Sequence, residues 1–168
     1  MQASSMIIRP ETSDDYEVIQ SLTNAAFEPK PFGDGNEGDI ISAMRIAGDL
    51  LLSLVAEEDG AVIGQASFSP VKIACAGRWA SLGPIAVVET RQRQGIGSEL
   101  AKQGLNWLEQ QGYDGCVLIG NPKVYGSMGF VSGGLTYRDL PEHLPQYVSL
   151  SGLVPSGEIT FATALEEA

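Results

Sequence analysis

Apolar residues along the chain are grouped into short runs that have the length and composition of β-strands. Each run is rich in β-branched or aromatic residues and is bounded by polar residues, glycine or proline, which is the pattern of strands in a packed sheet. Asp59 and Gly60 separate two of these runs and predict a hairpin turn. The predicted strands are Met6–Arg9, Leu51–Glu57, Ala61–Ile73, Trp79–Val88, Cys116–Gly120 and Gly157–Phe161.

Amphipathic stretches with helical spacing lie between these runs. Ser13 is expected to cap a first helix, whose apolar positions are Tyr16, Ile19, Leu22 and Ala26. A loop rich in proline, glycine and acidic residues is predicted over Glu28–Gly38, followed by a second helix over Asp39–Ala47. A third helix, Ile96–Gln111, is predicted to bury one face on the sheet, and its apolar positions are Ile96, Leu100, Leu105 and Leu108.

The segment Leu82–Gly97, LGPIAVVETRQRQGIG, predicts a strand, a short charged turn and a glycine pair that opens a helix. Such a turn leaves backbone N–H groups unpaired at the positive end of the helix dipole, which favours a bound phosphate. Arg91 and Arg93 add mobile positive charge at the same place. The predicted ligand is therefore a cofactor that carries phosphate.

The glycine spacing distinguishes between cofactor classes. The dinucleotide fingerprint Gly-x-Gly-x-x-Gly fails because Leu100 stands where the third glycine is required, and the P-loop pattern is absent. Residues Gln92–Gly97 read Gln/Arg-x-x-Gly-x-Gly/Ala, which resembles the pyrophosphate-binding motif of the GNAT superfamily, the acetyl-CoA-dependent N-acyltransferases. The alternative is a plain strand–turn–helix with glycine at a tight bend.

A second match to the same superfamily lies downstream, where Tyr125 to Phe130 have the spacing Tyr-x-x-x-Gly-Phe. The resemblance implies that Tyr125 lies beside the cofactor sulfur and acts as the general acid for the leaving thiolate. The alternative interpretation of Tyr125 is a half-buried aromatic ring that packs on Phe130.

The resemblance also implies the fold and the cofactor site. It implies an α/β (mixed α+β) GNAT fold, with a central mixed sheet of about six to seven strands whose parallel strands 4 and 5 splay apart between flanking helices. The cosubstrate would be acetyl-CoA, with its pantetheine arm in the splay and no metal. The predicted cofactor-binding residues are Ile85, Ala86, Val87, Arg93, Gln94, Gly95, Ile96, Gly97, Ser98 and Asn121.

Direct acyl transfer needs a donor for the oxyanion and a base for the amine. A backbone N–H of Ala86 or Val87 is the predicted oxyanion donor. No carboxylate stands between Trp79 and Val88, where many family members place their general base. The open alternatives are a chain of waters or an acid from the Glu28–Asp39 loop.

Other residues near the predicted site have weaker cases as the base. Glu89 follows the strand directly and is expected to face solvent, while Ser81 could relay a proton to water. His143 is the only histidine, and its place in a proline-flanked loop favours a structural or exposed position.

Composition and charge limit the remaining possibilities. The 168 residues are expected to form a single domain, with a cofactor core at about 80–130. A net charge of −11 argues against nucleic acid and suits a cationic acceptor, a small-molecule or peptide amine held by the acidic loop Glu28–Asp39, where reversing Glu37 and Asp39 to lysine would test the role. No apolar run is long enough to span a membrane, which predicts no membrane partner.

The termini and cysteines bear on location and assembly. Met1–Ser5 has no secretory pattern, and the two cysteines, Cys75 and Cys116, are interpreted as reduced core residues. The expected location is cytoplasmic, and a homodimer is left open.

Two classes of protein remain as alternatives to an N-acetyltransferase. One is a non-catalytic acetyl-CoA-binding sensor or regulatory module, and the other is a dinucleotide-using α/β protein.

Overall fold

A computed structural model of the chain describes residues 6–28 and 35–168. Its strands are β1 (Met6–Pro10), β2 (Leu52–Glu58), β3 (Ala61–Ile73), β4 (Trp79–Val87), β5 (Gly115–Ile119), β6 (Val131–Ser132), β7 (Leu135–Thr136), β8 (Pro145–Ser149) and β9 (Gly157–Phe161). Its α-helices are α1 (Tyr16–Phe27), α2 (Glu37–Ala47), α3 (Ile96–Gln110), α4 (Pro122–Tyr125) and α5 (Thr163–Glu166). Its 3-10 helices are η1 (Ser13–Asp15), η2 (Glu89–Arg91) and η3 (Gly126–Met128).

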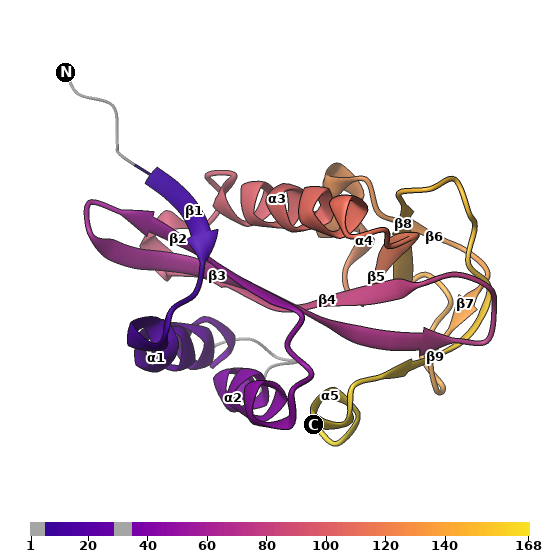
Figure 1. The fold of residues 1–168 in the computed structure, drawn as a ribbon, viewed down its shortest axis with the longest axis horizontal. Helices are drawn as coiled ribbons and strands as arrows, with labels where there is room; N and C mark the ends of the chain where they lie inside the picture. Colours follow the sequence, from indigo (N-terminus) through magenta and orange to yellow (C-terminus); the bar gives the residue numbers. More distant parts are fainter. Residues whose placement is uncertain (1–5, 29–34) are drawn as a thin grey trace.

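The strands form a mixed sheet in the order β1-β2-β3-β4-β5-β8-β6, with β9 paired to β3 and β7. Neighbours are antiparallel from β1 to β4, while β4 and β5 are parallel. The helix α3 lies on one face of the sheet, and α1, α2 and α5 lie on the other (Figure 1). The expected mixed α/β fold with a parallel β4–β5 pair is confirmed, and the described sheet has more strands than predicted because short strands near the C-terminus join it.

The parallel pair β4–β5 is joined only at its start. Trp79, Ala80 and Ser81 of β4 pair with β5, and no strand of the described residues pairs with that edge of β4 beyond Ser81. β5 instead continues alongside β8 up to Ile119. The two strands therefore separate and leave backbone N–H and C=O groups of β4 without a partner strand.

A bulge in β4 lies at the same place. Leu82 pairs with Phe68 and Ile85 with Ala66, so β4 carries one more residue than β3 between these pairs. One extra residue reverses which face each later side chain occupies. Leu82 before the bulge and Ile85 after it both contact the core beneath α3. In a regular strand, residues three positions apart would lie on opposite faces of the sheet.

The core between the sheet and α3 accounts for the helix position. The predicted apolar face is confirmed, because Ile96, Leu100, Leu105 and Leu108 are buried. Gly104 lies directly against the ring of Phe68, and a Cβ at this position would overlap that ring. The close approach of α3 to β3 therefore depends on glycine at position 104.

The opposite face of the sheet is covered by α1 and α2. Ile19 of α1, Ile41 of α2 and Val55 of β2 form a small buried cluster there. A second cluster packs the C-terminal strands against Trp79 and Val117.

Arg9 of β1 forms ion pairs with Asp15 at 2.7 Å and with Glu57 at 3.0 Å, and these contacts join β1, η1 and β2.

Three local predictions differ from the structure. Ser13 does not cap the first helix but lies inside η1, where the Asp15 carboxylate accepts a hydrogen bond from the Thr12 backbone N–H at 2.7 Å. The second helix begins two residues earlier than expected, at Glu37, so the acidic end of the predicted Glu28–Gly38 loop is helical, while residues 29–34 of that loop lie outside the described residues. Cys75 is only partly buried, because it lies in the bend after β3 rather than within a strand.

Candidate functional site

A cleft of about 520 Å³ opens between the end of β4, the start of α3 and the α4–η3 segment, and is called the α3 cleft here. It occupies the place where β4 and β5 have separated. The predicted site residues that line it are Ile85, Ala86, Val87, Arg93, Gly95, Ile96, Gly97, Ser98 and Tyr125. Residues that sequence reasoning brought together from two separate motifs thus share one cavity.

The start of α3 presents free backbone donors to this cleft. Gly95 precedes the helix in the left-handed conformation (φ +85°), and no side chain caps the helix. The first helical hydrogen bond runs from the Glu99 N–H to the Gly95 carbonyl at 3.0 Å, so the N–H groups of residues 96–98 have no acceptor within the helix. The N-terminus of this 15-residue helix therefore presents free N–H groups at the positive end of the helix dipole, an arrangement that favours an anion.

Backbone conformation favours glycine at position 95 but not at position 97. The Gly97 backbone is not in the left-handed region, and a Cβ there would lie 3.9 Å from both Ile85 Cδ1 and Val87 Cγ2, an ordinary contact distance. The protein itself therefore has room for a side chain at position 97. Since Gly97 lines the α3 cleft, the space that a side chain would occupy there is part of the cleft.

The two arginines of the turn have different environments. Arg91 lines the cleft, but it forms an ion pair with Glu58 and donates to the Gln94 side chain at 2.9 Å, so its guanidinium is held in place rather than mobile. Arg93 is exposed and lines the cleft, with its backbone in the left-handed region (φ +63°). Arg93 is thus the arginine of the pair whose charge is directed to the cleft without a carboxylate partner among the described residues.

The hydrogen-bond alternation of β4 decides which backbone groups face the cleft. The Val88 N–H donates to the Ile63 carbonyl at 2.9 Å, so Val88 faces β3. In an antiparallel ladder every second residue faces the same neighbour, which also turns Ala86 toward β3. Ile85 and Val87 therefore direct their backbone groups into the gap, and the Val87 carbonyl already accepts a hydrogen bond from the Gln92 side chain at 3.0 Å.

Tyr125 lies at the end of α4 and reaches the same cleft from the opposite wall. Its ring contacts Phe130 edge to face, with centroids 6.2 Å apart, so the predicted aromatic packing is present. The ring also lies against Gly120, where an added Cβ would overlap it. Burial raises the pKa of the Tyr125 hydroxyl, which keeps the phenol protonated well into the alkaline range.

Two predicted site residues do not line the α3 cleft among the described residues. The Gln94 side chain is held by Arg91, and the Asn121 side chain accepts a hydrogen bond from the Lys123 N–H at 2.9 Å. Asn121 thereby caps α4, the helix that carries Tyr125. Direct cofactor contact by either residue stays a prediction.

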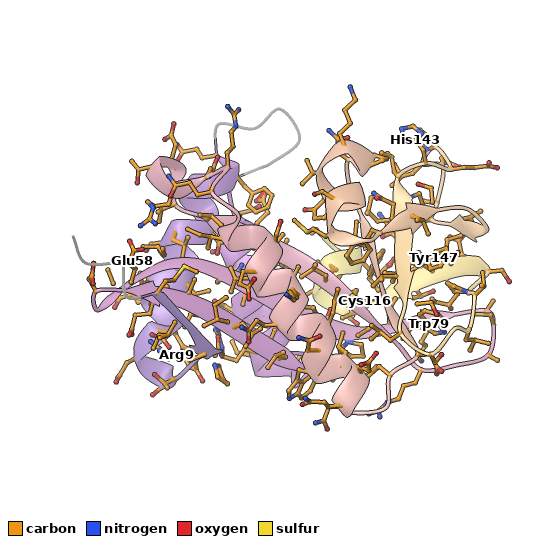
Figure 2. All side chains as sticks on the ribbon, turned by 90° about the horizontal axis from the view of Figure 1, so that it is seen from above. Arg9, Glu58, Trp79, Cys116, His143 and Tyr147 are labelled. Atoms are coloured by element: carbon orange, nitrogen blue, oxygen red, sulfur yellow. The ribbon has the colours of Figure 1, made fainter. Side chains whose placement is uncertain are left out.

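The candidates for a base are distributed over several places. Glu89 is exposed, as expected, and His143 is exposed at the rim of the molecule, away from α3 (Figure 2). The buried Ser81 hydroxyl shares a hydrogen bond with the Ser69 hydroxyl at 2.8 Å. Asp39 accepts a hydrogen bond from the Gln20 side chain at 2.6 Å, which ties α1 to α2.

A second cavity, of about 270 Å³, adjoins the bulge of β4 and is called the bulge cavity here. It lies on the face covered by α1, α2 and α5, and Ser81–Pro84 of β4 forms one wall. Phe27 lines both cavities. The sequence indicated Phe27 only as the first residue of a segment, Phe27–Asp39, expected to carry acceptor specificity, because no local pattern distinguishes it from any other apolar residue of α1.

Other side chains of the α3 cleft also lacked a sequence signal. Lys123, Val124, Ser127 and Met128 line it from α4 and η3. Their position between Asn121 and the Gly-Phe pair of the second motif is the one feature that could have indicated them.

Three further observations concern the described residues. No group of three or more His, Cys, Asp or Glu side chains is arranged among them to hold a metal ion. None of the described helices combines the length and the hydropathy of a membrane span. Cys116 lies in the interior, and burial raises the pKa of its thiol, which keeps that thiol protonated (Figure 2).

Comparisons with known proteins identify the family. Residues 16–130 match the family described as "Acetyltransferase (GNAT) family". The uncharacterized N-acetyltransferase YhbS of Escherichia coli K12 is 35% identical over 127 residues, which cover 74% of this chain and 73% of YhbS.

Solved structures extend the similarity to the whole fold. A GNAT family acetyltransferase from Brucella melitensis, crystallised in complex with acetyl-CoA, is 38% identical, with a TM-score of 0.83 over 95% of this chain and 97% of its own. The Escherichia coli YhbS structure, in complex with CoA, is 29% identical, with a TM-score of 0.89 over 99% of this chain and 94% of its own.

Proposed function

The chain belongs to the GNAT acetyltransferase family, and we propose that it transfers the acetyl group of acetyl-CoA to a primary amine. The observation that carries this proposal is the α3 cleft, where an uncapped helix start, a free strand edge and Tyr125 line one cavity. The complexes of the Brucella melitensis protein with acetyl-CoA and of YhbS with CoA support the same cofactor here.

The proposed cofactor position follows from the donors in the cleft. The pyrophosphate binds the N–H groups of Ile96, Gly97 and Ser98, with Arg93 nearby to balance its charge. The pantetheine arm runs back along β4, where Ile85 and Val87 supply backbone groups to its amides. Between the two backbone donors predicted for the oxyanion, the ladder alternation favours Val87 over Ala86.

The proposed reaction needs no covalent enzyme intermediate. The lone pair of the neutral amine forms a C–N bond with the thioester carbonyl carbon, and the resulting oxyanion accepts a hydrogen bond from the β4 backbone. The C–S bond then breaks, and the leaving thiolate takes a proton from the Tyr125 hydroxyl. The surplus proton on nitrogen leaves to water, and Tyr125 is reprotonated from solvent.

A binding and turnover assay tests the proposal. Acetyl-CoA at about 100 times its dissociation constant should stabilise the fold by roughly 2.7 kcal/mol, whereas NAD should not stabilise it. Release of free CoA thiol should then depend on added amine. Stabilisation by acetyl-CoA without thiol release from any amine would favour a non-catalytic sensor instead, and no stabilisation at all would contradict the proposed site.

The organisation of the protein around this site is also part of the proposal. The continuous sheet supports a single domain over residues 1–168, with its cofactor core at about 80–130. A cytoplasmic location and a homodimer stay predictions from the sequence.

A further inference from the structure

The bulge cavity adjoins the α3 cleft, and Phe27 lines both. We infer that the acyl acceptor binds in the bulge cavity and that it is a primary amine carried by a small apolar body. The inference rests on the proposed acetyl transfer, since it names the second substrate of that reaction.

The course of β4 brings the two cavities together at the reacting carbonyl. The phosphate site lies beyond the C-terminal end of β4, so a cofactor arm following the free edge from Val87 through Ile85 reaches the bulge next. Residues Ser81–Pro84 at that bulge form a wall of the bulge cavity. Phe27 lines both cavities, so its side chain stands at the boundary between the acyl end of the cofactor and the proposed acceptor.

The size and lining of the bulge cavity indicate the body of the acceptor. Five apolar residues, each from a different element, line it: Phe27, Ile40, Ile119, Phe161 and Leu165. Pro84 at the bulge adds to this lining. A cavity of about 150 Å³ holds benzene, so one of about 270 Å³ suits a ligand on the order of ten non-hydrogen atoms. An apolar lining favours an alkyl or aryl group over a polyamine or a sugar.

The polar groups of the bulge cavity indicate the charge of the acceptor. Glu37 is the charged residue among the described residues that line it, and no described lysine or arginine does so. Its carboxylate accepts a hydrogen bond from the Asn36 N–H at 3.0 Å and places a negative charge in the lining of the cavity. Burial also raises the pKa of Tyr137, so this lining phenol stays neutral. An ammonium group therefore finds an opposite charge here, and a carboxylate does not.

An acceptor panel tests the substrate class in the wild-type protein. The probes are phenylethylamine, which carries its amine on an apolar body, and the polar amines ethanolamine and spermidine, with CoA thiol release as the readout. We expect kcat/KM for phenylethylamine to exceed that for ethanolamine by at least about tenfold, since a filled apolar pocket discriminates by that amount or more. Equal or better turnover of ethanolamine or spermidine would overturn the inference and leave the proposed transfer standing.

A pair of substitutions on one helix tests the location. Ile40 lines the bulge cavity, whereas Ile46 on the same helix is 88% exposed. Ile40→Trp should fill the cavity and raise the KM for phenylethylamine at least about tenfold, and Ile46→Trp should leave it unchanged. The dissociation constant of acetyl-CoA, measured by calorimetry, should be the same in both variants and in the wild type.

Glu37→Gln tests the charge without changing the shape of the side chain. Loss of a charge-assisted hydrogen bond should raise the KM for phenylethylamine about tenfold or more, with little change in acetyl-CoA affinity. An unchanged KM in both Ile40→Trp and Glu37→Gln would overturn the inferred location. If acetyl-CoA binds but no amine of the panel releases thiol, the proposed transfer itself fails, and the inference fails with it.

Discussion

The α3 cleft and the bulge cavity adjoin the same strand but are built from different kinds of groups. The α3 cleft presents mainly backbone: the free N–H groups at the start of α3 and the unpaired edge of β4. The bulge cavity presents side chains that come from α1, α2, β4, β5, β9 and α5. A phosphate-bearing ligand that does not vary can be held by backbone, whereas a variable acceptor is selected by side chains that can be exchanged without changing the fold.

The largest effect that this comparison predicts is at Tyr125, the proposed acid where the two substrates meet. Tyr125→Phe keeps the ring and its edge-to-face contact with Phe130 and removes the proton. Turnover should fall by at least about 10²-fold, as measured by thiol release at saturating substrates. Acetyl-CoA affinity should not change, and near-normal turnover would reduce Tyr125 to a packing residue.

The pH dependence of the wild type sharpens the same prediction. A tyrosine donates its proton only below its pKa, and burial raises the pKa of Tyr125 above the ordinary value of about 10. The rate at saturating substrates should therefore show no loss from Tyr125 ionisation below about pH 10, with loss only above it. A fall in rate near pH 8 that Tyr125→Phe abolishes would contradict the raised pKa.

The position of the Tyr125 ring offers a smaller and more selective perturbation. Gly120→Ala places a Cβ against that ring and should displace it, lowering turnover by about tenfold to 10²-fold because small misplacements weaken proton transfer. Gly126→Ala is the matched control, since Gly126 is helical and has open space around its Cβ position. Equal rates in the two variants would show that the ring position does not limit the reaction.

The smallest predicted effect is at Asp39, which lies in the same predicted acidic segment as Glu37. Asp39 is bound to the Gln20 side chain, whereas Glu37 lines the bulge cavity. Asp39→Ala should lower the free energy of unfolding by about 1 kcal/mol, measured by urea denaturation, and leave the acceptor KM unchanged. A rise in KM equal to that of Glu37→Gln would place Asp39 in the acceptor site as well.

The contrast between the two cavities also explains what could be predicted from the sequence. A backbone site needs glycines at fixed spacing, so Gly95 and Gly97 indicated the α3 cleft, and the apolar face of α3 indicated how that helix packs. The bulge of β4 leaves no such pattern, because one extra residue at Gly83–Pro84 is visible only against the register of β3.

The residues of the bulge cavity could not be assembled from the sequence for a related reason. Phe27, Ile40 and Leu165 are ordinary apolar residues of three helices, and they meet only because the sheet brings those helices together. The ion pair between Arg91 and Glu58 was missed for the same reason. Glu58 ends β2 and Arg91 ends η2, and only the fold brings these two elements together.

The dissociation constant of acetyl-CoA, measured by calorimetry in three proteins, tests most directly the claim that the two substrates occupy separate cavities. We expect wild type and Glu37→Gln to bind equally, and Gly97→Val to bind at least about tenfold more weakly, because its side chain enters the space kept for the phosphate. Equal binding by all three would remove the phosphate site from α3. A loss in Glu37→Gln as large as in Gly97→Val would contradict the separation of the two cavities.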